Sequence, residues 1–343
     1  MSINHIQFSY MNIESLYGKH GVEFISITNN VGLEVVLSNY GASIYQLKID
    51  LEEMVLTPKN FETFFHNTKY YGLTIGRIAG RVKNGLLTVN DKTYQLEQNE
   101  GSNCLHGGYH SIAFRKWRTQ VITTKEYIII KFYLTTKKGE GGFNGKCEYI
   151  VSYKIHADDN IIQVKYDAVC KEDTYFALTN HSYFNLGHDK DILSHRLRIK
   201  ANEVSTMDKD DFTINGYIPV DNTIFDFREM KLIKKDIKDE QLHNIKWLNG
   251  YDHRFHLESI PKEEANISLD NGNYKMNIYT DFDSVHLYTG GFTSHDVLID
   301  DDIDDIYRGV ALECSSLYPE FKKKKEHYIH FVKYVFRRKS DEN

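Results

Sequence analysis

The sequence has little proline, little cysteine and no long hydrophobic run. It contains 4 Pro and 4 Cys among 343 residues, and the cysteines form no C-x-x-C pair. This spacing argues against a zinc framework and against a disulfide-dense secreted scaffold. No stretch approaches the roughly 20 apolar residues of a membrane-spanning helix, and the first residues lack the basic-then-apolar layout of a signal peptide. We therefore predict a reduced, cytoplasmic protein with no membrane partner.

An excess of positive charge is also lacking. Lys and Arg total 42 against 48 Asp and Glu, which gives a formal net charge of −6. Nucleic acids and anionic membrane surfaces reward a positive field, so neither is an expected partner. The one basic block, Lys322–Lys325, is interpreted as a solvated stretch, and the acidic run Asp300–Asp305 as an exposed loop.

Aromatic and β-branched residues are abundant, with 24 Tyr and 19 Phe. They gather in short runs bounded by Gly, Asn and Asp, a pattern typical of strands. Strands are predicted at 22–28, 127–134, 149–155, 161–166, 274–280, 284–289 and 328–336, and a hairpin turning at Asn90-Asp91 is predicted over 86–96. The best helix candidate, Ile233–Ile245, is weak. With no break in composition, the pattern favours one large antiparallel β domain over residues 1–343, either a sandwich or a barrel.

Several polar residues do not fit the strand pattern, and each has an ordinary structural explanation. His106 precedes two glycines and suits a sharp turn, His181 could be a satisfied core histidine, and Asp252 could be a turn residue. Glu313 follows Val-Ala-Leu in an apolar strand, where it either points to solvent or is buried for a reason. The remaining members of this group are interpreted as loop caps (Asn180, Asn185) or surface charges (Arg77, Arg81).

Taken together and in this order, these motifs resemble the aldose 1-epimerase (galactose mutarotase) family. The resemblance begins at Leu37–Ile44, close to an early strand of the family, and runs nearly end to end. It includes Gly76–Arg81, Leu105-His106-Gly107-Gly108, Asn180-His181-Ser182-Tyr183-Phe184-Asn185-Leu186, Phe225–Arg228, Gly250-Tyr251-Asp252-His253, Leu287–Gly290 and Ala311-Leu312-Glu313. The Asn-His-Ser-Tyr-Phe-Asn-Leu segment is the most specific of these.

The resemblance implies a large β-sandwich of the galactose mutarotase type, with an open cleft for a free hexose. It implies that Glu313 is the general base, that His181 is the general acid and that His106 assists at the ring oxygen. Arg81 and Asp252 would hold sugar hydroxyls, and Asn180 would be a binding or supporting residue.

Mutarotation suits these residue types. A proton leaves the anomeric hydroxyl, another reaches the ring oxygen, and the ring opens and recloses on the other face. Carboxylate and imidazole groups can move both protons, and no electron or group is transferred. No cofactor or metal is therefore expected.

The chain departs from the family pattern after Glu313, where Cys314-Ser315-Ser316 replaces the frequent Thr-Gln. Two alternatives stay open. One is an epimerase for a phosphorylated or other sugar, for which the Arg77–Arg81 pair is weak support. The other is a non-catalytic carbohydrate-binding protein on the same fold. A glycosidase would need two carboxylates astride the scissile bond, whereas only Glu313 has a catalytic setting. The preferred sugar and the oligomeric state are not encoded in the spacing.

Overall fold

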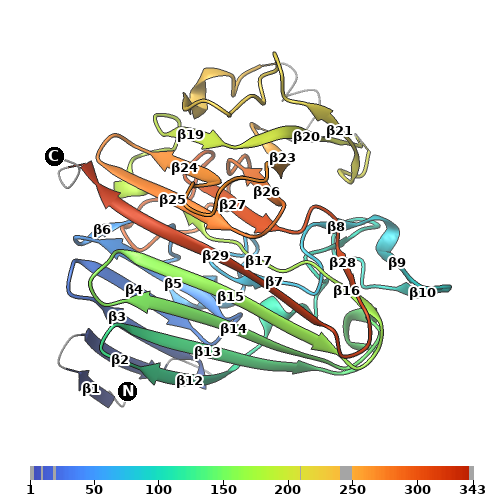
Figure 1. Ribbon diagram of the computed structural model, residues 1–343, viewed down its shortest axis with the longest axis horizontal. Coiled ribbons are helices and arrows are strands. Elements are labelled where there is room, and N and C mark those ends of the chain that lie inside the picture. Colours follow the sequence, from blue (N-terminus) through green and yellow to red (C-terminus); the bar gives the residue numbers. More distant parts are fainter. Residues whose placement is uncertain (1–3, 9–10, 18–20, 209, 240–248, 340–343) are drawn as a thin grey trace.

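A computed structural model describes residues 4–8, 11–17, 21–208, 210–239 and 249–339. Three antiparallel sheets dominate it (Figure 1). The widest has nine strands in the order β12 (Arg118–Thr123), β13 (Tyr127–Thr136), β14 (Cys147–His156), β15 (Ile161–Cys170), β29 (His327–Arg338), β25 (Tyr274–Thr280), β24 (Ile267–Asp270), β19 (Arg196–Ile199), β22 (Lys231–Leu232).

Two six-stranded sheets complete the layers. The first runs β1 (Asn4–Phe8), β2 (Met11–Tyr17), β3 (Glu23–Thr28), β4 (Leu33–Ser38), β5 (Ser43–Ile49), β6 (Glu52–Glu53). The second runs β18 (Tyr183–Phe184), β27 (Val310–Ser315), β26 (Ser284–Tyr288), β23 (Asp252–Leu257), β20 (Ala201–Met207), β21 (Ile214–Pro219). The predicted all-β class and the sandwich implied by the resemblance are confirmed.

Short elements connect these sheets. Short strands form two-stranded sheets: β9 (Leu86–Val89) pairs with β10 (Lys92–Gln95), β8 (Arg81–Val82) with β11 (Cys104–Leu105), β7 (Thr74–Ile75) with β17 (Thr179–Asn180), and β16 (Thr174–Phe176) with β28 (Glu320–Lys322). The helical pieces are α1 (Phe61–Phe65) and the 3-10 turns η2 (Lys83–Gly85), η3 (Ile112–Phe114), η4 (Glu140–Gly142), η5 (Leu186–His188) and η6 (Ile233–Lys235). In the described part of the chain, no helix is long and apolar enough to cross a membrane.

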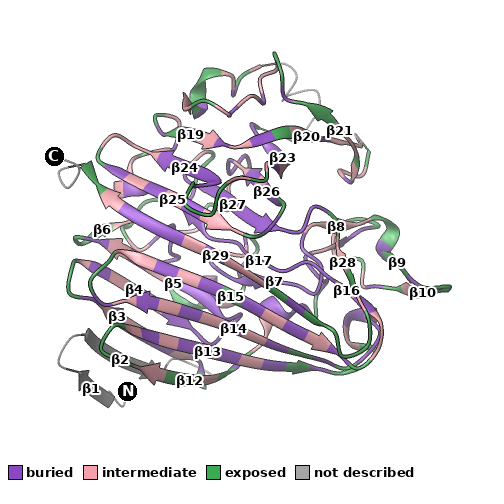
Figure 2. Cartoon of the chain, in the orientation of Figure 1, coloured by how far each residue is buried: buried purple, intermediate pink, exposed green. Residues whose placement is uncertain are grey.

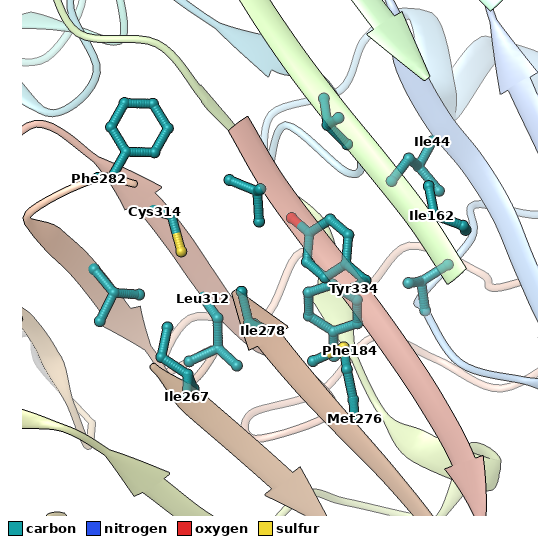
Figure 3. Close-up of a cluster of buried hydrophobic side chains, with 14 of the residues drawn as sticks. Ile44, Ile162, Phe184, Ile267, Met276, Ile278, Phe282, Leu312, Cys314 and Tyr334 are labelled. Atoms are coloured by element: carbon teal, nitrogen blue, oxygen red, sulfur yellow. The ribbon is translucent and has the colours of Figure 1, made fainter. Parts of the chain in front are cut away.

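The core lies between the nine-stranded sheet and the two smaller sheets, because one cluster of buried side chains draws on all three. Along β13, β14 and β15, alternation sends every second side chain into it. Figure 2 shows this as alternating bands of burial along β13, β14 and β15. In Figure 3, Leu312 and Cys314 of β27 point toward Ile278 of β25 and Tyr334 of β29.

The predicted strands and the hairpin at 86–96 are all present, with Asn90 in the left-handed turn at φ +53°. The predicted helix at 233–245 is wrong where it can be compared. Only Ile233–Lys235 forms a helical turn, and 240–248 lies outside the described residues. The early motif at residues 37–44 spans the connection from β4 to β5 rather than one strand.

Two predicted surface charges are in fact buried. Arg77 is 3% exposed and donates to the Asn144 carbonyl (2.6 Å) and the Thr174 hydroxyl (3.1 Å). Asp304, inside the acidic run expected to be exposed, is 1% exposed and accepts from the Tyr71 hydroxyl (2.7 Å). A buried charge needs such partners to offset its lost hydration, and these partners come from distant parts of the chain that no local pattern reveals.

Candidate active site

A cleft of about 640 Å³ opens beside the six-stranded sheet that contains β23, β26 and β27. This volume falls within the range of small-molecule sites. Five of the six predicted site residues line it, namely Arg81, His106, His181, Asp252 and Glu313. Segments far apart in the sequence therefore meet at one site.

Glu313 enters the cleft because of strand alternation. Its neighbours Leu312 and Cys314 point into the core (Figure 3), so the side chain between them points to the opposite face. Glu313 is 5% exposed, and burial raises the pKa of its carboxyl to about 7, against the opposing effect of the nearby His286 and Arg254. A buried carboxyl with a pKa near the working pH is well matched to general acid–base catalysis.

His181 lies next to this carboxyl. It directly follows β17, and its backbone N–H donates to the Leu73 carbonyl (2.9 Å). Its Nε2 atom is 3.4 Å from Oε1 of Glu313. Burial lowers the pKa of His181 to about 4, although its own backbone carbonyl and Asp252 favour the charged form. Burial thus outweighs the support that Asp252 gives to the charged form, and between a pH of about 4 and about 7 the proton of this pair resides on Glu313.

His106 presents a hydrogen-bond donor. It sits in a left-handed turn at φ +52°, and the next residue must be glycine because a Cβ at Gly107 would lie 2.3 Å from the Gly76 carbonyl oxygen. The backbone N–H of Gly80 donates to Nδ1 of His106 (3.2 Å). Burial lowers the pKa of His106 well below its usual value. The ring is therefore neutral, and with Nδ1 accepting, its proton is on Nε2.

The same residues include a set of possible metal ligands, since donor atoms of His106, His181 and Glu313 lie within 4.8 Å of one another. A metal at Nε2 of His106 would have to displace the proton that the Gly80 hydrogen bond fixes there. The tautomer of His106 therefore suits a hydrogen bond to a ligand oxygen better than a metal bond.

Arg81 and Asp252 are each oriented by a residue that the sequence analysis did not single out. Glu100 accepts two hydrogen bonds from Arg81, from Nε (2.7 Å) and from Nη2 (2.8 Å). His286 contacts Oδ1 of Asp252 through Nε2 (2.5 Å). Burial alone would raise the pKa of Asp252, but His286 and the charge of Arg81 hold it well below its usual range. Asp252 is therefore an ionised acceptor beside a guanidinium donor.

Asn180 lies behind the cleft rather than in its lining. It is 3% exposed, donates from Nδ2 to the Gly72 carbonyl (2.7 Å), and accepts from the N–H (3.1 Å) and hydroxyl (2.6 Å) of Ser182. These bonds occupy its amide and brace the segment that carries His181. The geometry favours the supporting role over direct sugar binding.

Among the cleft residues that the sequence analysis missed, His286 and Arg254 stand out. Both directly adjoin motif segments, since His286 precedes Leu287–Gly290 and Arg254 follows His253. Strand alternation in these segments was the available signal. Asp252 and Arg254 share one face of β23, and His286 lies opposite Arg254 on β26.

Comparisons with known proteins identify the family of this chain. The family model described as aldose 1-epimerase matches residues 23–325. The chain is 29% identical to aldose 1-epimerase of Escherichia coli (strain K12) over 333 residues, 91% of this chain and 94% of that protein. It is 29% identical to galactose mutarotase of Homo sapiens over 269 residues, 76% of this chain and 75% of that protein.

Solved structures show the same likeness in three dimensions. Galactose 1-epimerase from Lactobacillus acidophilus NCFM superimposes with a TM-score of 0.86 at 25% identity, covering 96% of this chain and 98% of that one. An aldose epimerase homologue from C. elegans gives a TM-score of 0.82 at 25% identity, covering 92% of this chain and 98% of that one. With the family model matched over most of the sequence, the chain belongs to the aldose 1-epimerase family of isomerases.

Proposed function

We propose that this protein interconverts the α and β anomers of free hexoses such as galactose and glucose. The observation that carries the proposal is the buried Glu313–His181 pair, with Nε2 and Oε1 3.4 Å apart in a cleft of sugar-accommodating size. A pair with one exchangeable proton can accept a proton from one sugar oxygen and donate one to another.

In the proposed reaction, the proton of the pair first passes from Glu313 to His181. The Glu313 carboxylate then takes the proton of the anomeric hydroxyl while protonated His181 gives its proton to the ring oxygen. The C1–O5 bond breaks, its electron pair stays on O5, and C1 becomes an aldehyde carbon. Rotation about C1–C2 presents the other face, and reclosure reverses both proton transfers. The O1–H bonding pair becomes the second bond of the C1=O group, so only protons and bonding pairs move, nothing is oxidised or reduced, and the chemistry calls for no cofactor.

His106 supports the ring oxygen in this scheme. Its Nε2–H donor faces the same cleft, and its ring contacts that of His181 edge to face, with centroids 5.4 Å apart. A fixed donor aimed at an oxygen that changes charge lowers the barrier without reorganising. When Glu313 ionises, its carboxylate also favours the imidazolium form of His181.

Arg81 would donate hydrogen bonds to sugar hydroxyls, and Asp252 would accept hydrogen bonds from them. Both are ionised, and both are held by neighbours that leave part of their hydrogen-bonding capacity for a ligand. Ion–hydroxyl bonds are stronger than neutral ones, which suits a polar ligand that competes with water.

The phosphorylated-sugar alternative loses its earlier support. It depended on Arg77 standing beside Arg81, but Arg77 is buried against Asn144 and Thr174 and does not line the cleft. The carbohydrate-binding alternative would not require the Glu313–His181 pair.

The test is polarimetry on freshly dissolved α-D-galactose and α-D-glucose with the wild type and with Glu313→Gln. Acceleration by the wild type alone is the expected result, and it also ranks the two sugars. A folded wild type that accelerates neither sugar would refute the proposal. Hexose phosphates would then be assayed, and sugar binding without turnover would support the binding-protein alternative.

A further inference from the structure

Arg254 is a buried cation in the cleft that the reaction scheme does not use. It lies on β23, is 7% exposed and lines the cleft. Its Nη1 donates to the Leu317 carbonyl (3.1 Å), but its buried Nε has no hydrogen-bond partner. Its Nη2 would lie only 3.1 Å from a Cβ at Gly80, so the guanidinium occupies space between Gly80 and Leu317. Burying such a group costs free energy unless another charge compensates.

The other lysines and arginines of the cleft already have carboxylate partners. Lys69 pairs with Asp304, Arg81 with Glu100, and Lys83 with Asp208 and Asp211. Within the described residues, Arg254 alone among these cations forms no ion pair.

Among the groups near Arg254, Glu313 is the carboxylate that lines the cleft with it. Tyr217, Glu313 and Asp283 act on its charge. Tyr217 is neutral because burial raises its pKa to about 12. Asp283 accepts from the Leu317 N–H (2.6 Å). Glu313, in turn, has no lysine or arginine within ion-pair distance among the described residues.

The strand register aligns the two groups. Arg254 of β23 lies opposite His286 of β26, and His286 lies opposite Glu313 of β27. Directly opposed residues in a sheet share a face, so the three form one row across the cleft. Neighbouring strands are about 4.8 Å apart, which separates the backbones of Arg254 and Glu313 by about 10 Å. The hydrogen bond to the Leu317 carbonyl holds the guanidinium of Arg254 near the segment that follows β27.

We infer that Arg254 is a positioning residue for catalysis, whose fixed positive charge favours the ionised form of Glu313 and thereby sets the pH range of turnover. The inference deepens the proposed function and rests on it. Arginine suits the role because it stays protonated at any physiological pH. His286 lies between the two, but its Nε2 is committed to Asp252.

The size of the effect follows from Coulomb's law. At the backbone separation of about 10 Å, taken as the scale of the distance between the two groups, two unit charges at an effective dielectric constant of about 20 shift a pKa by about one unit. The other groups facing Glu313 are His106, His181, His286, Asp252, Arg81 and Tyr183, and an Arg254 variant leaves them in place.

The experiment compares the pH dependence of kcat/KM for the wild type, Arg254→Met and Arg254→Lys. In Arg254→Met, the fall of kcat/KM on the alkaline side (the alkaline limb) should lie about one pH unit higher than in the wild type, because the carboxylate becomes harder to ionise. For the same reason, the maximum value of kcat/KM should be lower. Arg254→Lys should keep the limb near its wild-type position. Arg198→Met is the matched control, since Arg198 also has a buried Nε without a partner but does not line the cleft.

A readout without turnover separates this inference from the proposed function. Carbon-13 NMR titration of the Glu313 carboxyl, assigned with Glu313→Gln, should show the same upward shift in Arg254→Met. A shift in a protein that mutarotates no sugar would sustain the charge pairing and refute the proposed function. An unmoved carboxyl pKa in folded Arg254→Met would overturn the inference. A rise in KM with an unmoved limb would also overturn it and make Arg254 a sugar-binding residue.

Discussion

The pH profile of turnover offers the most direct check on the Glu313–His181 pair. Burial raises the pKa of Glu313 to about 7 and lowers that of His181 to about 4. The pair therefore holds one proton between these values, two below them and none above. Since the reaction needs one proton to give and one site to accept, kcat/KM should be bell-shaped and follow the one-proton state.

The magnitude can be worked out from the same two values. With limbs at about 4 and about 7, the one-proton fraction is about 0.9 at pH 6 and about 0.09 at pH 8, so kcat/KM should fall about tenfold over that interval. Polarimetry at limiting sugar measures it, with the spontaneous rate in each buffer subtracted and circular dichroism checking the fold. Glu313→Gln should show no alkaline limb.

One outcome would refute this reasoning. If kcat/KM rose through pH 7 and stayed level to pH 9, ionised Glu313 would act alone as base, and the ring oxygen would receive its proton from a group other than the pair.

Three further predictions follow from single side chains. Glu313→Gln should lower kcat by about 10²- to 10⁴-fold with little change in sugar affinity, since it removes the proton acceptor but keeps the shape; wild-type turnover would remove Glu313 from the mechanism. Arg81→Ala should raise KM roughly 10- to 100-fold through loss of charged hydrogen bonds, and steady-state kinetics with unchanged KM and kcat would place Arg81 outside the site. Arg77→Met should lower the free energy of unfolding by about 1–3 kcal/mol, because Asn144 and Thr174 lose a buried partner; urea unfolding measures this loss, and an unaltered midpoint would show that the network contributes nothing net.

Local patterns were informative wherever a residue's neighbours in sequence decide its environment. Runs such as 127–134 and 161–166 alternate in burial as expected, because strand side chains point to opposite faces in turn. The same alternation places Glu313 opposite Leu312 and Cys314. The order of the motifs along the chain indicated the aldose 1-epimerase family. That residues 1–343 form one domain, and that the protein is cytoplasmic, stay predictions.

The tertiary structure decided which charges are buried and what they meet. Arg77 and Asp304 look like surface residues in sequence, yet each is buried among distant partners. His286 reaches Asp252 only because β26 pairs with β23. The proton balance between His181 and Glu313 likewise depends on how deeply each is buried. Sequence determines the strand pattern and the inventory of acid, base and hydrogen-bonding groups, whereas only the packed sheets fix their distances and dielectric surroundings, and hence their protonation.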